Sequence, residues 1–462
     1  MQYVSTRGTT DPLGFQDAVL TGLAPDGGLL VPAEIPDLTG DLNHLASLDF
    51  VELAKRILLR FIDDIPAPDL EDLVDAAYRT FTHPGVVRLK HAGDIPVLEL
   101  FHGPTLAFKD VALQLLGQLF DYILKGRGQR LNILGATSGD TGSAAIAGVR
   151  GRPAIDIFVM YPHGRISPLQ ELQMTTVTDD NVHCIAVEGS FDDCQRLMKS
   201  AFSDLDFKAT HALGSINSVN WARVLAQIVY YAYASLKLPA PVSFCVPTGN
   251  FGNIFAGYLA RRMGFPIHRL ILATNENDIL SVFFRTGLYR RGPVQFTISP
   301  SMDIQVASNL ERFLYYHLDE DPYALHAFMD AFDRTGEARL APPGGDVFLA
   351  TAVDTPNTMA AIRQVYEETG YVADPHTAVG LAAARRVDVD GTVACLATAH
   401  AAKFPEAVNE AVGEPVARHP MLEALKDKPS RRTVLPADVA TVKRFIEERA
   451  GHGSPRQWLR SP

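Results

Sequence analysis

A lysine in an apolar setting is the first residue of this sequence whose type and position suggest chemistry. Lys109 lies between Phe108 and Asp110 in the segment FHGPTLAFKD, directly before an amphipathic helical pattern. Apolar neighbours would partly desolvate its amine, and desolvation favours the neutral amine, which attacks aldehydes. Seen alone, the residue could equally be a surface lysine near a helix terminus.

Two glycine-containing loops have the composition of anion-binding turns. Residues 137–142 read TSGDTG after the apolar run LNILGA, and residues 248–253 read TGNFGN after SFCVP. Glycines allow close approach of the backbone, and the N–H groups at a helix N-terminus bind carboxylates and phosphates. Neither loop matches the GxGxxG or Walker fingerprints of nucleotide sites, and either one alone could be an ordinary capping turn.

Hydrophobic periodicity predicts the elements that position these loops. Short runs rich in Ile and Val alternate with helical patterns between residues 97 and 398, as in a doubly wound α/β protein with parallel sheets. The expected strands are Leu131 to Ala136, Ile155 to Tyr161, Val182 to Val187, Val242 to Val246, Ile267 to Ala273 and Val393 to Thr398. The expected helices include Asp110 to Leu124, Phe191 to Phe202, Ser218 to Leu236 and Thr358 to Thr369. Ligands bind beyond the carboxyl ends of such strands, so the loops that follow strands are the expected sites.

The hydrophobic pattern changes along the chain and predicts four structural regions. We expect a helical capping subdomain over residues 1–95, with helices near residues 49–61 and 70–81. Residues 96–130 and 217–400 are expected to form a large α/β domain, and residues 131–216 a small one. Residues 401–462 form a C-terminal extension whose tail, GHGSPRQWLRSP, is expected to fray.

Composition and charge exclude several classes of function. The 462 residues are 47% hydrophobic and 21% charged, which is typical of a globular protein with more than one domain. A net charge of -11 argues against nucleic acid and anionic membranes as partners. The sequence has no apolar stretch near the ~18 residues of a membrane span, no secretory leader, no metal-binding motif and four scattered cysteines. We therefore expect a cytoplasmic protein without a metal site.

Taken together and in this chain order, the three segments resemble the threonine synthase family, which are pyridoxal-phosphate enzymes of the tryptophan synthase β type. The resemblance extends to GLAPDGGLLVP, YPHGRISPLQ, NSVNWARVLAQ, SMDIQVASNLERF and ATAHAAKFPEAV, and so covers nearly the whole chain. It implies fold type II: two open twisted α/β domains with the cofactor in the cleft between them, and an N-terminal subdomain.

The same resemblance implies a role for each residue of a cofactor site. Lys109 would form the Schiff base with pyridoxal 5'-phosphate. The cofactor phosphate would be bound by Gly249, Asn250, Phe251, Gly252 and Asn253. Asp140 would lie near the cofactor ring, where relatives often have Asn, and the difference matters because an ionised carboxylate cannot donate a hydrogen bond. Thr398 would place its hydroxyl against the pyridine nitrogen. A threonine at a strand end can instead hydrogen-bond to backbone groups.

A second set of residues is expected to bind the substrate. Thr137, Ser138 and Thr141 would bind its α-carboxylate. Its phosphate would be bound by Asn217, Ser218, Asn220 and Arg223, with Arg165 as an additional contact. The planar fork of arginine suits phosphate oxygens, but either arginine could instead form a structural ion pair.

The implied reaction is the last step of threonine biosynthesis. Phosphate would be eliminated from O-phospho-L-homoserine and water added at Cβ, giving L-threonine. A phospho-lyase or dehydratase of the same fold, releasing a 2-keto acid, is the nearest alternative. A nucleotide-binding α/β protein would explain the glycine loops but not Lys109. A non-catalytic binding module is a third alternative, and the intact set of site residues argues against it. The sequence leaves open whether the chain is a monomer or a homodimer.

Overall fold

The computed structural model describes residues 1–451, so most of the tail expected to fray, residues 452–462, lies outside the described residues. Two compact units make up the chain. Of the described residues, unit 1 comprises 1–75, 81–112 and 218–418, and unit 2 comprises 76–80, 113–217 and 419–451. These units divide the chain differently from the four parts expected from sequence, and that division into four stays a prediction.

Unit 1 is built on a six-stranded sheet in the order β13-β10-β9-β14-β4-β3. All neighbours are parallel except β3, which forms an antiparallel hairpin with β4. The strands are β3 (Arg88–Ala92), β4 (Ile95–Glu99), β9 (Val242–Pro247), β10 (Ile267–Thr274), β13 (Phe348–Ala352) and β14 (Thr392–Ala397). In register, Cys395 of β14 lies opposite Cys245 of β9 and Val97 of β4. The carboxyl ends of these parallel strands therefore meet at one edge of the sheet.

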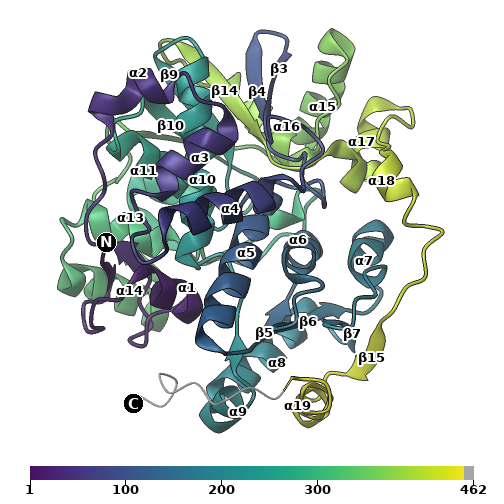
Figure 1. Ribbon diagram of the computed structural model, residues 1–462. Coiled ribbons are helices and arrows are strands. Elements are labelled where there is room, and N and C mark those ends of the chain that lie inside the picture. Colours follow the sequence, from purple (N-terminus) through teal and green to yellow (C-terminus); the bar gives the residue numbers. More distant parts are fainter. Residues whose placement is uncertain (452–462) are drawn as a thin grey trace. The chain divides into compact units, whose positions relative to one another are not determined.

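Helices cover both faces of this sheet (Figure 1). α10 (Trp221–Lys237) packs on α11 (Gly252–Arg262), which contacts β9 and β10. α15 (Thr355–Thr369) and α16 (Pro375–Ala384) cover the other face. Their buried aliphatic residues form one core with the inner side chains of β4, β9, β10 and β14. Burial on both faces explains why these strands are continuously apolar.

Shorter elements complete unit 1. Its strands outside the main sheet form two antiparallel pairs, β1 (Tyr3–Ser5) with β2 (Leu30–Pro32) and β11 (Leu288–Arg290) with β12 (Glu337–Arg339). Its further helices are α1 (Phe15–Thr21), α2 (Leu42–Leu45), α3 (Phe50–Leu58), α12 (Ile279–Thr286), α13 (Leu310–His317), α14 (Pro322–Thr335) and α17 (Pro405–Val412). Three short 3-10 helices are Thr39–Asp41, Pro300–Met302 and Ala401–Lys403. The chain passes between the units within α4 (Ala67–Tyr78) and α5 (Lys109–Arg127).

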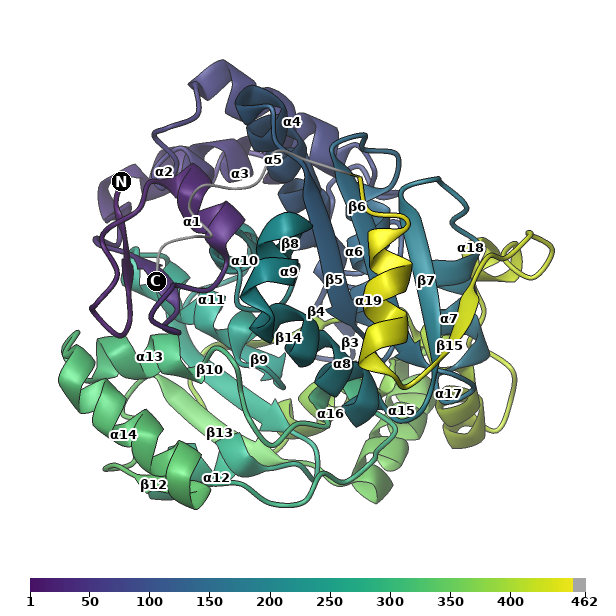
Figure 2. The same cartoon turned by 90° about the horizontal axis from the view of Figure 1, so that it is seen from below.

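Unit 2 contains a parallel five-stranded sheet in the order β15-β7-β6-β5-β8. Its strands are β5 (Leu131–Ala136), β6 (Ile155–Pro162), β7 (Val182–Glu188), β8 (Leu213–Gly214) and β15 (Thr433–Pro436). Its helices are α6 (Asp140–Val149), α7 (Pro168–Thr175), α8 (Phe191–Ser203), α9 (Leu205–Thr210), α18 (Pro420–Glu423) and α19 (Val439–Glu447). α6 and α7 lie on one face of the sheet, and α8 and α19 lie on the other (Figures 1 and 2).

The structure confirms the expected α/β class and all six expected strands. β5 has the predicted bounds, and the other five end within one residue of the prediction. α10 begins at Trp221 rather than at Ser218, because the Asn220 side chain accepts a hydrogen bond from Ala222 N–H and caps the helix. The hairpin of β3 and β4 and the edge strand β13 were not predicted, because their short runs show no marked period in the sequence.

Candidate active site

Lys109 is the first residue of α5, and the turn before it is tied to the end of β14. Phe108 N–H donates to the Thr398 carbonyl oxygen at 2.8 Å, and His400 N–H donates to the Leu106 carbonyl oxygen at 3.1 Å. Leu106 has a positive φ of 60°, which turns the backbone sharply into the helix. These contacts place Lys109 beside Thr398, two residues that sequence analysis expected in one site.

A buried polar cluster fixes the same turn from the other side. Asp110 is fully buried and accepts hydrogen bonds from Thr105 N–H and Thr105 Oγ1, both at 2.8 Å. Lys403 Nζ donates to the Thr105 carbonyl oxygen at 2.8 Å. Burial raises the pKa of Asp110 to about 6, although Thr105 and Lys403 act to lower it. A Cβ at Gly103 would lie 2.4 Å from the Asp110 Cβ, so the close approach requires glycine there.

The amine of Lys109 reaches the segment that borders the loop of residues 248–253. Lys109 Nζ donates to Ser301 Oγ at 3.3 Å and lies 5.3 Å from the Phe108 ring centroid. The Ser301 carbonyl oxygen lies 2.6 Å from where a Cβ of Gly249 would be. The side chain of Lys109 is only 9% exposed, as its apolar neighbours predicted. Unit 1 therefore brings together Lys109, Thr398 and the glycine loop after β9.

That loop has the geometry of an anion cradle. Phe251 adopts the left-handed conformation, with a φ of 64°, and precedes α11, which starts at Gly252. The first N–H groups of a helix have no acceptor within the helix, so those of α11 are available to an anion. The side-chain oxygen of Asn253 accepts hydrogen bonds from Tyr230 at 2.6 Å and Tyr231 at 2.8 Å. Its buried Nδ2 has no acceptor among residues 1–451.

Two residues that were not expected in the site, Asn309 and Arg312, support this loop. Asn309 Nδ2 donates to the carbonyl oxygens of Asn250 and Ser218, each at 3.2 Å. Arg312 is fully buried and donates to Asn309 Oδ1 at 2.6 Å and to the Val219 carbonyl oxygen at 2.6 Å. Burial lowers the pKa of Arg312 to about 9. Both residues belong to the run SMDIQVASNLERF, where the resemblance was the only available signal.

The residues expected to bind the substrate phosphate gather at the start of α10. Ser218, Asn220 and Arg223 all lie in unit 1, and Ser218 Oγ lies 2.9 Å from Ser308 Oγ. Arg223 is 5% exposed, and burial lowers its pKa to about 10. Asn220 is used structurally, since it caps α10 and its Nδ2 donates to the Val19 carbonyl oxygen at 2.8 Å. Asn217 precedes this group as the last residue of that segment of unit 2.

The loop of residues 137–142 lies in unit 2, between β5 and α6. Thr137 Oγ1 accepts hydrogen bonds from Gly139 N–H at 3.0 Å and Gly142 N–H at 2.9 Å. Asp140 is buried and accepts a hydrogen bond from Gln170 Nε2 at 3.1 Å. Ser138 is exposed, so its hydroxyl is accessible to a ligand. The strand, loop and helix expected from sequence are all present.

Two further residues of unit 2, Thr141 and Arg165, were also expected to bind the substrate. Thr141 is half-buried in the first turn of α6. Arg165, also in unit 2, is exposed and makes no ion pair with the described residues, which disfavours the structural alternative considered for it.

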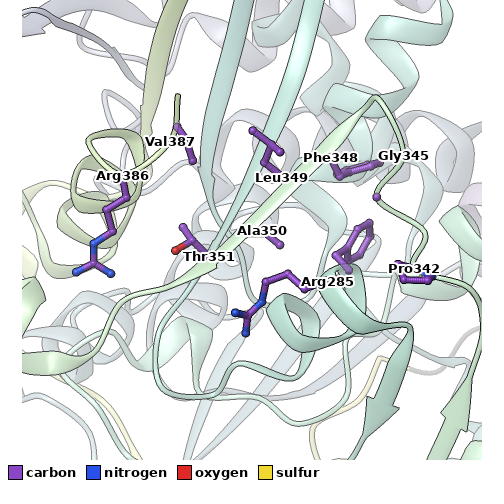
Figure 3. Close-up of a pocket in the computed structure, with 11 residues that line it drawn as sticks. Arg285, Pro342, Gly345, Phe348, Leu349, Ala350, Thr351, Arg386 and Val387 are labelled. Carbon is purple, nitrogen blue, oxygen red and sulfur yellow. The ribbon is translucent and has the colours of Figure 1, made fainter. Parts of the chain in front are cut away.

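A separate pocket of about 400 Å³ borders the edge strand β13 (Figure 3). It is lined by Phe284, Arg285, Pro342, Gly344, Gly345, Phe348, Leu349, Ala350, Thr351, Arg386 and Val387. Arg285 Nε donates to the Ser281 carbonyl oxygen, and Arg386 donates to the Ala352 carbonyl oxygen. None of the residues expected from sequence lines this pocket, so it does not coincide with the candidate active site.

Two other kinds of feature are absent from residues 1–451. No group of three or more His, Cys, Asp or Glu side chains is arranged to hold a metal ion. No described helix combines the length and apolar character that crossing a membrane requires.

Three family models match the chain in order. They are "Threonine synthase N terminus" over residues 2–78, "Pyridoxal-phosphate dependent enzyme" over residues 90–333 and "Threonine synthase, C-terminal" over residues 377–446. Threonine synthase of Pseudomonas aeruginosa is 46% identical over 470 residues, covering 98% of this chain and all of the relative.

Solved structures agree with these matches. The pyridoxal-phosphate-bound threonine synthase of Brucella melitensis has a TM-score of 0.95 and 46% identity, covering 97% of this chain and 99% of the other. Yeast threonine synthase has a TM-score of 0.92 and 40% identity, covering 97% and 98%. The cofactor of the chain is pyridoxal 5'-phosphate, and its fold is type II. The chain therefore belongs to the threonine synthase family of pyridoxal-phosphate-dependent lyases.

Proposed function

We propose that the chain converts O-phospho-L-homoserine into L-threonine and inorganic phosphate, with the cofactor carried on Lys109. The observation that carries the assignment is the position of the Lys109 amine. It lies against Ser301, which borders the glycine loop, and its helix start is bonded to Thr398. A buried arginine, Arg223, supplies a second cationic group in the same unit, as a phosphorylated substrate requires.

The residues of unit 1 fit pyridoxal phosphate. The start of α11 offers main-chain donors for its phosphate, and Asn253 Nδ2 is a buried donor without an acceptor among residues 1–451. A side chain at Gly249 would collide with Ser301, so the backbone there is bare. Thr398, 6% exposed, would place a neutral hydroxyl near the pyridine nitrogen. When bound, the cofactor supplies an electron sink for carbanions at the substrate carbons.

The chain's own residues would orient the substrate and move its protons. The Lys109 amine is the acid and base for protons at Cα and Cβ, a role worth about 10² to 10⁴ in rate. Arg223 and Ser218 would bind the substrate phosphate, and Arg165 would add a contact from unit 2. Ser138, Thr141 and Thr137 would bind the α-carboxylate at the start of α6, where helix N–H groups favour anions. Asp140 accepts a hydrogen bond from Gln170, which leaves it able to orient a donor near the ring.

The assignment of the lysine is tested by trapping the cofactor. Absorbance of the purified protein is recorded before and after borohydride, and the reduced peptide is mapped by mass spectrometry. We expect the label on Lys109. A label on another lysine would overturn the proposed site.

The identity of the product tests the reaction. Incubation with O-phospho-L-homoserine should release phosphate and threonine in equal amounts. Release of phosphate with 2-oxobutyrate instead would establish the phospho-lyase alternative.

We also propose the cytoplasm as the location. The four cysteines are buried and unpaired, which suits a reducing compartment. Whether the chain acts as a monomer or a homodimer is decided by sedimentation of the cofactor-loaded protein.

A further inference from the structure

A buried pair, Asp374 and His376, contacts Ser301, the residue whose hydroxyl accepts a hydrogen bond from Lys109. His376 Nδ1 and Asp374 Oδ1 are 2.8 Å apart, and both side chains are almost fully buried. The Asp374 carboxylate also accepts hydrogen bonds from His376 N–H at 2.9 Å, from Thr377 N–H at 3.3 Å and from Thr377 Oγ1. Four donors therefore fix this carboxylate at the start of α16. The His376 imidazole, which is bonded to this carboxylate, is held in place with it.

The contacts of His376 define its tautomer. Ser301 N–H donates to Nε2 at 3.2 Å, so Nε2 carries no proton. Nδ1 must then carry the proton and donate it to Asp374. The Phe404 ring, with its centroid 4.9 Å from that of the imidazole, packs against the same side chain. The neutral imidazole is thus a fixed acceptor for one particular amide, that of Ser301.

Ser301 uses its other groups toward the cofactor site. Its Oγ accepts a hydrogen bond from Lys109 Nζ at 3.3 Å. Its carbonyl oxygen lies against the bare backbone of Gly249, at the start of the glycine loop. One residue therefore contacts both the lysine and the turn that begins the proposed cofactor-phosphate loop.

Ser, His and Asp are also the residue types of a hydrolytic triad, but the geometry here is different. His376 meets the amide of Ser301 and not its hydroxyl. The imidazole cannot take a proton from Oγ in this arrangement, so it does not make Ser301 a nucleophile. The arrangement orients Ser301 and leaves its hydroxyl directed at the amine of Lys109.

We infer that Ser301 is a positioning residue for Lys109, and that Asp374 and His376 act through it by holding its backbone in place. This inference rests on the proposed function, because it takes Lys109 as the cofactor lysine. A lysine side chain has four rotatable bonds, and an acceptor at its end restricts where the amine lies. An amine that must exchange protons with two neighbouring substrate carbons needs such restriction, since small misplacements are costly in rate.

The first test is the substitution Ser301→Ala. It removes the acceptor without adding volume, so we expect kcat to fall about tenfold while KM changes by less than about twofold. Ser301→Thr restores a hydroxyl and should recover most of that loss. The matched control is Ser299→Ala, two residues earlier, whose hydroxyl meets Asn275 at 3.0 Å rather than the lysine. A fall in kcat of equal size in Ser299→Ala would overturn the inference.

The second readout needs no cofactor. In the apoprotein, the rate at which acetic anhydride acylates Lys109 is measured by peptide mass spectrometry. A hydrogen-bond acceptor favours the protonated, unreactive amine, so Ser301→Ala should raise this rate about threefold. Ser299→Ala should leave it unchanged. Equal acylation rates in Ser301→Ala and the unsubstituted protein would also overturn the inference.

The histidine is tested through its coupling to Ser301. His376→Leu removes the acceptor of Ser301 N–H, whereas His376→Gln keeps an oxygen near the position of Nε2 and should retain more activity. Because both residues act at one amine, Ser301→Ala combined with His376→Gln should lose no more kcat than Ser301→Ala alone. Independent, multiplying losses would overturn the role given to His376.

The two levels of proposal fail separately. A borohydride label on a lysine other than Lys109 overturns the proposed function. A label on Lys109, together with a Ser301→Ala variant that matches Ser299→Ala in kcat and acylation rate, overturns only the positioning role. Loss of the coupling between Ser301 and His376 overturns only the part played by Asp374 and His376.

Discussion

Two glycine-containing loops of this chain have the same strand–loop–helix arrangement, but different residues stabilise them. The loop of residues 137–142 follows β5 in unit 2, and the loop of residues 248–253 follows β9 in unit 1. Each connects a buried parallel strand to a helix N-terminus. The first is held mainly by its own threonine, and the second by residues distant in sequence. The difference shows which parts of an anion-binding loop a local sequence pattern can reveal.

The loop in unit 2 is stabilised mainly by hydrogen bonds between its own residues. Thr137 Oγ1 accepts hydrogen bonds from the amides of Gly139 and Gly142, two and five residues later. Such short-range bonds are typical of threonines in turns. The adjoining side chain, Asp140, adds one bond, from Gln170. The residues that shape this loop are therefore mostly inside it.

The loop in unit 1 is shaped from outside. The Asn250 carbonyl oxygen accepts from Asn309, and Asn253 accepts from Tyr230 and Tyr231. The Gly249 backbone lies against Ser301. None of these partners could be identified from the sequence TGNFGN. A cofactor site with such supports should be sensitive to substitutions far from it in the chain.

The largest expected effect comes from Lys109, whose amine donates to Ser301, a residue that borders the loop in unit 1. Lys109→Ala removes the cofactor attachment and the proposed acid and base, so kcat should fall by about 10² to 10⁴ or more. The side chain fills no aliphatic core, so the free energy of unfolding should change little. Initial rates and urea unfolding of the same preparation measure both. Retention of a tenth of the activity would remove Lys109 from the mechanism.

A pH effect should follow from Asp110, which holds the turn before α5. The folded protein raises the pKa of this buried carboxyl to about 6, so between pH 4 and 6 the folded state binds its proton more tightly than the unfolded state. Stability contributed by this group is then lost as the pH rises through that window, by up to about 3 kcal/mol. It stays lost above pH 6.

Unfolding by urea at several pH values measures this effect in the unsubstituted protein and in Asp110→Asn. The difference in unfolding free energy between the two should shift in favour of Asp110→Asn as the pH rises from 4 to 7. A constant difference across that range would show that Asp110 does not titrate with a raised pKa.

Lys109 and its neighbours in the site also show which features can be predicted from the sequence alone. The burial of Lys109 and the end of β5 were predictable from apolar neighbours and apolar runs, which are local signals, whereas the role expected of Lys109 came from the resemblance. Thr398 and the glycine loop were assigned by resemblance, and the structure shows Thr398 beside Lys109 through the bond from Phe108. Whether these residues have the implied roles stays a prediction.

The remaining supports were out of reach of local reasoning. Ser301 lies 192 residues from Lys109 in the sequence, and His376 lies 75 residues from Ser301. No periodicity or spacing links residues over such distances, because the sheet order brings them together. Asn220 illustrates the converse, since a residue that resembles a ligand proves to cap α10 and bind the Val19 carbonyl oxygen.

An intermediate effect is expected at Asn309, which donates to both segments proposed to bind phosphate. Asn309→Ala removes the side-chain donor to the carbonyl oxygens of Asn250 and Ser218 and one acceptor of Arg312, although Asn309 N–H still donates to the Asn250 carbonyl oxygen. The cofactor Kd and the substrate KM should both rise, each by about tenfold to hundredfold. Fluorescence titration of the apoprotein with pyridoxal phosphate and steady-state kinetics measure them. A change in only one of the two would show that Asn309 does not support both segments.

The smallest effect is expected at Thr137, the internal support of the loop in unit 2. Thr137→Val keeps the shape of the side chain but leaves two amides without an acceptor, which should cost about 1–2 kcal/mol of stability. Substrate KM should rise about fivefold, because 1 kcal/mol is worth about that factor. The cofactor Kd should stay within about twofold, since the loop's supports are local. Thr137→Ser, which keeps the oxygen, should behave like the unsubstituted protein. A rise in cofactor Kd as large as that in Asn309→Ala would contradict the difference proposed between the two loops. It would show that Thr137 affects cofactor binding in unit 1 and not only its own loop.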